Sequence, residues 1–138
     1  MSEHVRELTG HQVNPANDTL QVVVMDAPGA GGASHLYSVN GFDTETNASR
    51  DTNADDLGIY HGIDILFQNG PINEVGVNGL THEVLLEIVA DRLRSFQKGD
   101  FACKANECAL THIEEAQHWL QQRTLERMRR NVEGTHQR

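Results

Sequence analysis

The sequence predicts an α+β protein, oligomeric, in which a small antiparallel β-sheet forms the N-terminal half and a two-helix antiparallel hairpin follows. Short runs rich in β-branched residues occur before residue 68, separated by segments rich in Gly, Pro and Asn. After residue 80, apolar residues recur every three or four positions, as on an amphipathic helix. A chain of 138 residues is long enough for one core and short for two. We therefore expect a single domain over residues 19–138, strand-rich at 19–79 and helical at 80–134.

The strand-rich part is expected to begin after a flexible arm. Residues 1–18 have no usable periodicity and are interpreted as a tail, or as an arm laid on a neighbour. The Gly-rich segment 26–34 suits a hairpin loop, and the polar, acidic segment 43–56 is expected to be a mobile loop. Three short strands are predicted around these segments: Leu20–Met25, His35–Val39 and Ile63–Phe67.

The helical part follows an ordered turn at Gln68–Gly79, dense in turn residues but interleaved with apolar ones. Thr81 is a plausible N-cap for a first helix that extends to about Gln97. A second helix is predicted from about Asn106 to Asn131, and the short connection makes the two antiparallel. The predicted apolar stripes are Leu85, Ile88, Val89, Leu93 and Phe96 on the first helix, and Ala109, Ile113, Ala116 and Leu120 on the second.

Charge is unevenly distributed along the chain. The net charge is −9, and it resides in residues 1–78, whereas residues 79–138 are balanced. Duplex nucleic acid would be repelled, because its binding depends largely on phosphate neutralisation. A small phosphate-bearing ligand facing a local Arg cluster is not disfavoured in this way. A membrane span is not predicted, because no apolar stretch reaches about 18 residues.

The first candidate site is the segment Phe67-Gln68-Asn69-Gly70 together with Asn78, near the start of the first helix. It offers an aromatic face for stacking on a base, amide donors and acceptors, and the N–H groups of a helix start, which favour an anion. The alternative is that Phe67 is a core residue and the Asn and Gly residues only build turns. The residues alone favour this alternative.

The second candidate site is a set of cations on the helices. Arg123, Arg127 and Arg130 are spaced by four and three residues, so they share one helix face and form a competent phosphate clamp. Arg92 and Arg94 point to different sides of the first helix. The alternative is that cations near a helix C-terminus only complement the helix dipole.

Metal and catalytic sites are not expected, and neither is a cofactor. Cys108 and His112 are four residues apart on a helix with Cys103 nearby, but a structural zinc site needs four ligands. None of the eight His has Ser or Thr two residues later, so the two-histidine phosphodiesterase motif is missing. The segment Gly29-Ala-Gly-Gly32 lacks the Gly-Lys-Ser/Thr of a phosphate-binding loop.

Two stretches of the chain resemble one family. They are Ile63-Asp-Ile-Leu-Phe-Gln-Asn-Gly-Pro-Ile-Asn-Glu-Val-Gly-Val-Asn-Gly-Leu-Thr-His-Glu-Val-Leu-Leu-Glu-Ile-Val-Ala-Asp-Arg-Leu and Cys103-Lys-Ala-Asn-Glu-Cys-Ala-Leu-Thr-His-Ile-Glu-Glu-Ala. They are similar to the phage Thoeris anti-defence sponges of the first type, which share a helical hairpin with the anti-CBASS cyclic-nucleotide sponges. The resemblance covers residues 63–134 strongly and His35–Phe42 more weakly. The strand-bearing N-terminal half favours the Thoeris type.

The resemblance implies a non-catalytic protein that captures glycocyclic ADP-ribose signals made by TIR-domain enzymes. It implies a homodimer or homohexamer in the cytoplasm of the infected bacterial host, and in some members a separate site for cyclic di- or trinucleotides. The low aromatic content also suggests an oligomer. The rival hypothesis is a protein-interaction or oligomerisation module with no small-molecule ligand.

The resemblance also assigns roles to residues. Phe67 would stack on the adenine, while Asn78 and the turn from Gln68 to Gly70 would bond the ribose and base. The phosphates would face Arg92, Arg94 or Lys98, with Arg123 and Arg127 as second candidates. Two departures, Lys104 in place of a more usual Arg and the long loop at 43–56, leave the preferred cyclic nucleotide open.

Overall fold

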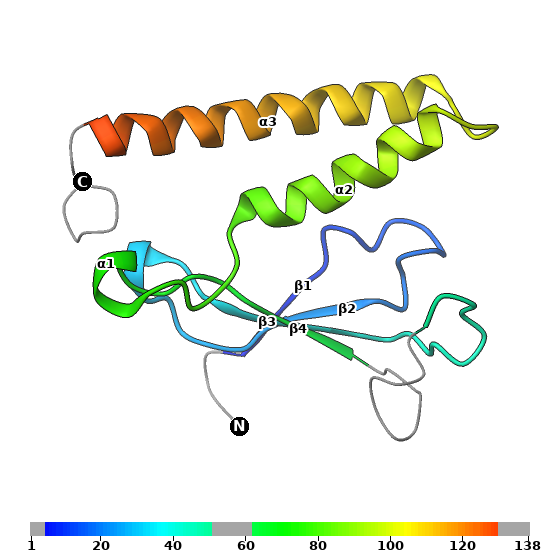
Figure 1. The fold of residues 1–138 in the computed structure, drawn as a ribbon. Helices are drawn as coiled ribbons and strands as arrows, with labels where there is room; N and C mark the ends of the chain where they lie inside the picture. Colours follow the sequence, from blue (N-terminus) through cyan, green and yellow to red (C-terminus); the bar gives the residue numbers. More distant parts are fainter. Residues whose placement is uncertain (1–4, 51–61, 130–138) are drawn as a thin grey trace. The chain divides into compact units, whose positions relative to one another are not determined.

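The computed structural model describes residues 5–50 and 62–129, and it confirms the predicted α+β class. A four-stranded antiparallel sheet has the strand order β1-β2-β3-β4. Three helices follow it in the chain (Figure 1). The strands are β1 (Arg6–Leu8), β2 (Gln21–Val24), β3 (Leu36–Asn40) and β4 (Gly62–Leu66).

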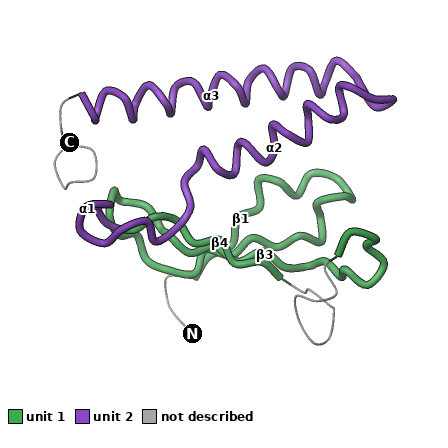
Figure 2. Tube along the Cα trace, viewed as in Figure 1, with its two compact units in different colours: residues 1–69 green, residues 70–138 purple. Residues whose placement is uncertain are grey.

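The chain divides into two compact units, Met1–Asn69 and Gly70–Arg138 (Figure 2). The first unit contains the sheet and the second contains the helices. The boundary lies ten residues before the division expected at residues 79 and 80. That residues 19–138 act as one domain stays a prediction.

Strand β1 lies within residues 1–18, which the sequence predicted to be a flexible tail or an arm laid on a neighbour. Arg6–Leu8 pairs antiparallel with β2, with Arg6 opposite Val24 and Leu8 opposite Val22. The strand has only three residues, which is too short for an alternating pattern to be recognised in the sequence. The segment is a strand because it pairs with β2, and three residues are too few to show the periodicity by which a strand is predicted.

The register of the sheet gathers apolar side chains on one face. Val22 lies opposite Val39 and Val24 opposite Tyr37, while β4 brings Ile65 opposite Tyr37. Residues directly opposite in a ladder point to the same side of the sheet. Val24, on the central strand β2, is fully buried. The core of the first unit therefore lies on this face.

The connections after β2 and β3 are held by side chain to main chain bonds and by glycine. The loop after β2 includes a short 3₁₀ turn, Ala30–Gly32. Gly41 ends β3 with φ +96°, and a Cβ there would collide with the carbonyl of Thr19. In the acidic loop, Asp43 and Asn47 accept hydrogen bonds from the N–H groups of residues two further on. Residues 51–56 of the predicted mobile loop lie outside the described part.

The helices match the predicted boundaries closely. Helix α2 (His82–Gln97) begins at the expected N-cap, where Thr81 Oγ1 accepts a hydrogen bond from Val84 N at 3.3 Å. Helix α3 (Lys104–Arg129) begins two residues before the predicted start. Its expected end at Asn131 and the stop at residues 133–135 lie outside the described residues. Helix α1 (Ile72–Val75) is a single turn inside the segment that was expected to be an ordered turn.

Helices α2 and α3 pack side by side (Figure 1), but partly through other residues than the predicted stripes. On α2, Ala90 is fully buried, while Ile88 is 55 % exposed and Val89 and Phe96 are also exposed. On α3, Ile113, Ala116 and Leu120 are half-buried as expected, whereas Ala109 is exposed. Leu85 and Leu93 of the predicted α2 stripe are half-buried, so the stripe is partly confirmed. In the described residues neither long helix is apolar enough to cross a membrane.

Candidate functional site

The proposed base-reading segment begins at the end of strand β4, in the first unit. Phe67 is half-buried, and its N–H donates to His35 O at 2.8 Å, which continues the pairing of β4 with β3. The ring meets Tyr37 edge-on, with centroids 5.6 Å apart and an angle of 88° between the planes. Tyr37 and Phe67 lie on the apolar face of the sheet, because Tyr37 is opposite Ile65, two residues before Phe67.

These contacts bear on the two interpretations of Phe67. The ring is packed against Tyr37, as a core residue would be, yet part of its surface is exposed. An aromatic ring that is held by a neighbour and still reaches solvent can serve as a stacking platform. That Phe67 stacks on a base stays a prediction.

The turn that follows is ordered by glycine and by main-chain bonds. Gly70 has φ +99°, and a Cβ would lie 3.1 Å from the Val75 side chain. Glu74 N and Val75 N both donate to Pro71 O, at 3.0 and 2.9 Å. The expectation of an ordered turn is confirmed. Gln68 is half-buried, whereas Asn69 and Asn78 are exposed.

Asn78 and the cations belong to the second unit, and Phe67 belongs to the first. Within the hairpin, the cations differ in what they contact. Arg94 donates from Nε and Nη2 to Glu114 of α3, at 3.3 and 3.1 Å, and Nη1 lies 3.5 Å from Glu87. Arg94 therefore links the two helices, and a phosphate would have to displace a carboxylate.

Arg92 lies on another side of α2, as expected from its spacing to Arg94. Its guanidinium stands over the ring of Phe96, 5.4 Å from the centroid. Lys98 is the C-cap residue of α2 and is exposed, as is Arg123 on α3, whereas Arg127 is half-buried. Arg130 lies outside the described residues. Arg92, Lys98 and Arg123 are thus the more accessible members of the cation set.

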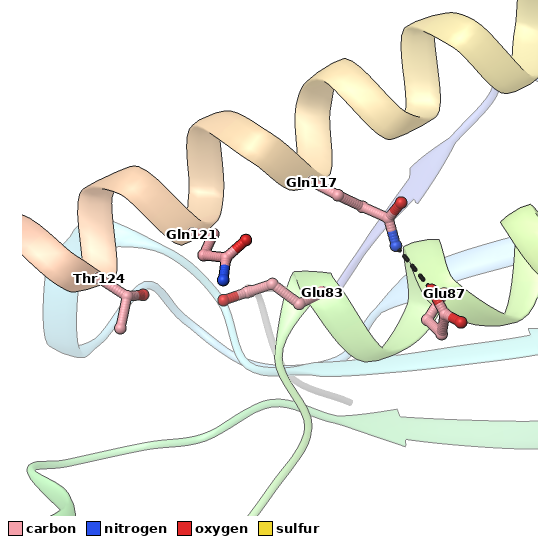
Figure 3. A pocket seen from close by; sticks show the side chains of 5 residues that line it. All are labelled: Glu83, Glu87, Gln117, Gln121 and Thr124. Atoms are coloured by element: carbon pink, nitrogen blue, oxygen red, sulfur yellow. Dashed lines mark hydrogen bonds between the residues drawn. The ribbon is translucent and has the colours of Figure 1, made fainter.

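A groove of about 330 Å³ runs between α2 and α3 and is lined by acidic and amide side chains (Figure 3). Its lining residues are Glu83, Glu87, Gln117, Gln121 and Thr124. Gln117 Nε2 donates to Glu87 Oε1 at 3.0 Å across the groove. Two carboxylates repel an anion, so this groove is unsuited to phosphate. The groove was not predicted from the sequence, although Glu83 and Glu87 at i,i+4 spacing indicate a shared helix face.

Two of the three residues considered for a metal, Cys103 and His112, have other contacts. His112 Nδ1 lies 3.1 Å from Glu115 Oε1, and Cys103 Sγ accepts a hydrogen bond from Asn106 N at 3.4 Å. Within residues 5–50 and 62–129, no group of three or more His, Cys, Asp or Glu side chains is placed to hold a metal ion.

The fold and the candidate site define a class of protein. In this class a small sheet is followed in the chain by a helical hairpin, and an ordered turn that carries an aromatic residue and Asn and Gln side chains connects the two. Comparison with known proteins identifies the hairpin. Residues 60–125 match the family model described as Acb2/Tad1, hairpin domain. The chain is also 49% identical over 72 residues to Thoeris anti-defense 1 from Bacillus phage SBSphiJ7. Residues 60–125 are therefore similar to the Acb2/Tad1 hairpin domain, which confirms the resemblance seen in the sequence.

The match to the phage protein covers part of each chain. It spans 52% of this chain and 51% of the relative. The chain thus spans about half the length of the curated relative that it matches. The family model begins before Phe67 and extends past Arg123. It includes the whole Phe67–Asn78 segment and both exposed cations of α2.

Proposed function

We propose that this protein is a phage anti-defence sponge that binds and sequesters cyclic nucleotide immune signals without cleaving them. The ligand we favour is glycocyclic ADP-ribose, the signal of Thoeris, with CBASS cyclic oligonucleotides as a further class. The observation that carries the proposal is the 49% identity to a phage protein named for Thoeris anti-defence. The place of action would be the cytoplasm of the infected bacterium.

The geometry at Phe67 supports a base-binding role. The ring is held by Tyr37 and by the main-chain bond to His35, and part of it reaches solvent. Stacking of a base on an aromatic ring contributes about 1–3 kcal/mol. The exposed amides of Asn69 and Asn78 add donors and acceptors suited to a ribose or a base edge.

The phosphate side is assigned to the more accessible cations. Arg92, Lys98 and Arg123 are exposed, whereas Arg94 already bonds Glu114. Each charge-assisted hydrogen bond contributes about 1.5–3 kcal/mol. A stack and several such bonds reach about −12 kcal/mol, a nanomolar affinity, once association costs are subtracted.

Assembly into a homodimer or homohexamer is part of the proposal. Large apolar side chains of the hairpin are exposed, among them Ile88 and Val89 on α2 and Trp119, 70 % exposed, on α3. Contacts between subunits would cover such residues. The same exposed residues favour the second candidate function, a protein-interaction module with no small-molecule ligand.

The two candidates are separated by Phe67→Ala. Native mass spectrometry with cyclic ADP-ribose isomers and cyclic oligonucleotides reports stoichiometry and preference together. A sponge loses affinity by roughly 5- to 150-fold, equivalent to about 1–3 kcal/mol of stacking, with its oligomer intact. Phe101→Ala is the matched control, because Phe101 is 76 % exposed in the turn between α2 and α3. The affinity of the Phe101→Ala variant for the nucleotide should not change.

Two results would contradict the proposal. Wild-type protein that binds none of these nucleotides favours the interaction module. Denaturing the loaded protein should release unaltered nucleotide, and recovery of a cleaved product would show an enzyme instead.

A further inference from the structure

The carboxylate of Asp26 organises the start of strand β3. Asp26 Oδ1 accepts hydrogen bonds from His35 N and Leu36 N, both at 2.9 Å, and Oδ2 lies 3.1 Å from His35 N. Ser34 Oγ donates to the main-chain oxygen of Asp26 at 2.8 Å. The N–H of Leu36, then that of His35 and the nearby His35 ring, hold the pKa of Asp26 below its usual 3.8 despite partial burial. The carboxylate is thus ionised at neutral pH.

His35, whose N–H is bonded to Asp26, is also bonded to Phe67. His35 O accepts the hydrogen bond from Phe67 N at 2.8 Å. The His35 peptide groups are therefore bonded on one side to Asp26 and on the other to Phe67. The His35 side chain is 6 % exposed and lies against Gly29, where a Cβ would approach the ring to 3.5 Å. Packing and hydrogen bonds together leave this residue little freedom.

The ring of Phe67 is oriented by the same strand. Tyr37, whose ring is edge-on to Phe67, follows Leu36, whose N–H is bonded to Asp26. A change in the path of β3 at His35 and Leu36 would therefore move both the main-chain and the side-chain contacts of Phe67. Stacking depends on ring position, and a ring fixed before the ligand arrives binds with a smaller entropy cost.

We propose that Asp26 is a positioning residue for the base-stacking ring of Phe67, acting through His35 and Tyr37. The inference rests on the proposed function, because it assumes that Phe67 stacks on the base of a nucleotide. It adds a residue outside the segment matched by the family model, which begins at residue 60.

A double-mutant cycle with glycocyclic ADP-ribose as the probe tests the inference. Asp26→Ala should weaken binding by about tenfold, since charge-assisted bonds to two N–H groups are lost. Asp26→Asn retains an Oδ1 acceptor without the charge, so the loss should be about threefold. In the Phe67→Ala background neither change should weaken binding further, because the ring they position is gone.

Asp43→Ala is the matched control. Asp43 also accepts a main-chain N–H, that of Glu45 at 2.9 Å, but it has no such connection to Phe67. Its removal should leave affinity unchanged. Circular dichroism and hydrogen exchange would verify that each variant is folded. If Asp26→Ala does not fold, the double-mutant cycle is measured with Asp26→Asn and Phe67→Ala.

Each outcome decides the matter. Wild-type protein that does not bind the probe overturns the proposed function and this inference with it. Wild-type protein that binds, with Asp26 variants equally damaging in the presence and absence of Phe67, overturns the inference alone. Unchanged affinity in both Asp26 variants does the same.

Discussion

The two compact units of this protein use their polar side chains in different ways. In the sheet unit the polar side chains bond the main chain: Asp26 accepts from His35 N and Leu36 N, and His11 Nε2 lies 2.6 Å from Leu20 O. In the hairpin, several polar side chains bond one another between helices, as in the pairs Arg94–Glu114 and Gln117–Glu87. The first arrangement specifies the path of the backbone, and the second joins the two helices.

The burial of the two units differs accordingly. The sheet unit buries Val24 and the polar residues Ser34, His35 and Thr44, whereas Ala90 is the buried residue of the hairpin among those described. Exposed ion pairs contribute little stability, about 0–1 kcal/mol each. We therefore expect substitutions that disturb the backbone of the sheet unit to cost more than substitutions in the contact between the helices.

The largest effect is expected at Gly41. Gly41→Ala places a Cβ against the carbonyl of Thr19 at a residue with φ +96°. The strain and the collision together should destabilise the protein by about 3 kcal/mol or more. Thermal unfolding measures the loss, and hydrogen exchange should locate it in β2 and β3. Gly31→Ala is the control, because φ is +76° but no atom lies within 4 Å of the added Cβ. Equal losses in the two variants would contradict the role of the collision.

An intermediate effect is expected at Ala90. Ala90 lies on α2 between Glu87 and Arg94, whose side chains bond residues of α3, so it faces that helix. Ala90→Leu should overpack this contact and cost about 1–3 kcal/mol in thermal unfolding. Val89→Leu changes an exposed neighbour and should remain within about 0.5 kcal/mol. A large loss at residue 89 would show that the opposite face of α2 is covered in solution.

The smallest effect is expected at Arg94. Arg94→Ala removes the bonds to Glu114 and Glu87, whose side chains are half-exposed or more. The loss of stability should be below about 1 kcal/mol and should shrink in high salt. Glu114→Ala should have a similar effect, and the double variant should cost less than the sum of the two. If Arg94→Ala abolished nucleotide capture while stability was unchanged, Arg94 would belong to the phosphate side.

Local sequence patterns were sufficient to predict secondary structure where the interactions that form an element lie within a few residues. Thr81 begins α2 as predicted, because its hydroxyl caps the N–H of Val84 three residues away. The ordered turn after Phe67 was indicated by Gly and Pro among apolar residues. Strand β1 was missed because its three residues are defined by pairing with β2. The contact face of α2 was partly wrong, because Ala90 is small and periodicity gives most weight to large residues.

For the candidate site, too, some features were indicated by the sequence and others were not. Phe67, its turn and the cations were proposed from residue types, spacing and the family resemblance. The support of Phe67 by Tyr37 and His35 was not, since these residues lie 30 and 32 positions earlier in the chain.

By itself, then, the sequence determined the α+β class, the helix boundaries and the segment that carries the candidate site. These depend on interactions within a few residues, such as capping, turn formation and helical periodicity. Only the tertiary structure decided that Arg94 of α2 is paired with Glu114 of α3, and that Asp26 is bonded through His35 to Phe67. Such contacts join residues distant in the chain or depend on which helix face meets a neighbour, and local pattern carries no information on either.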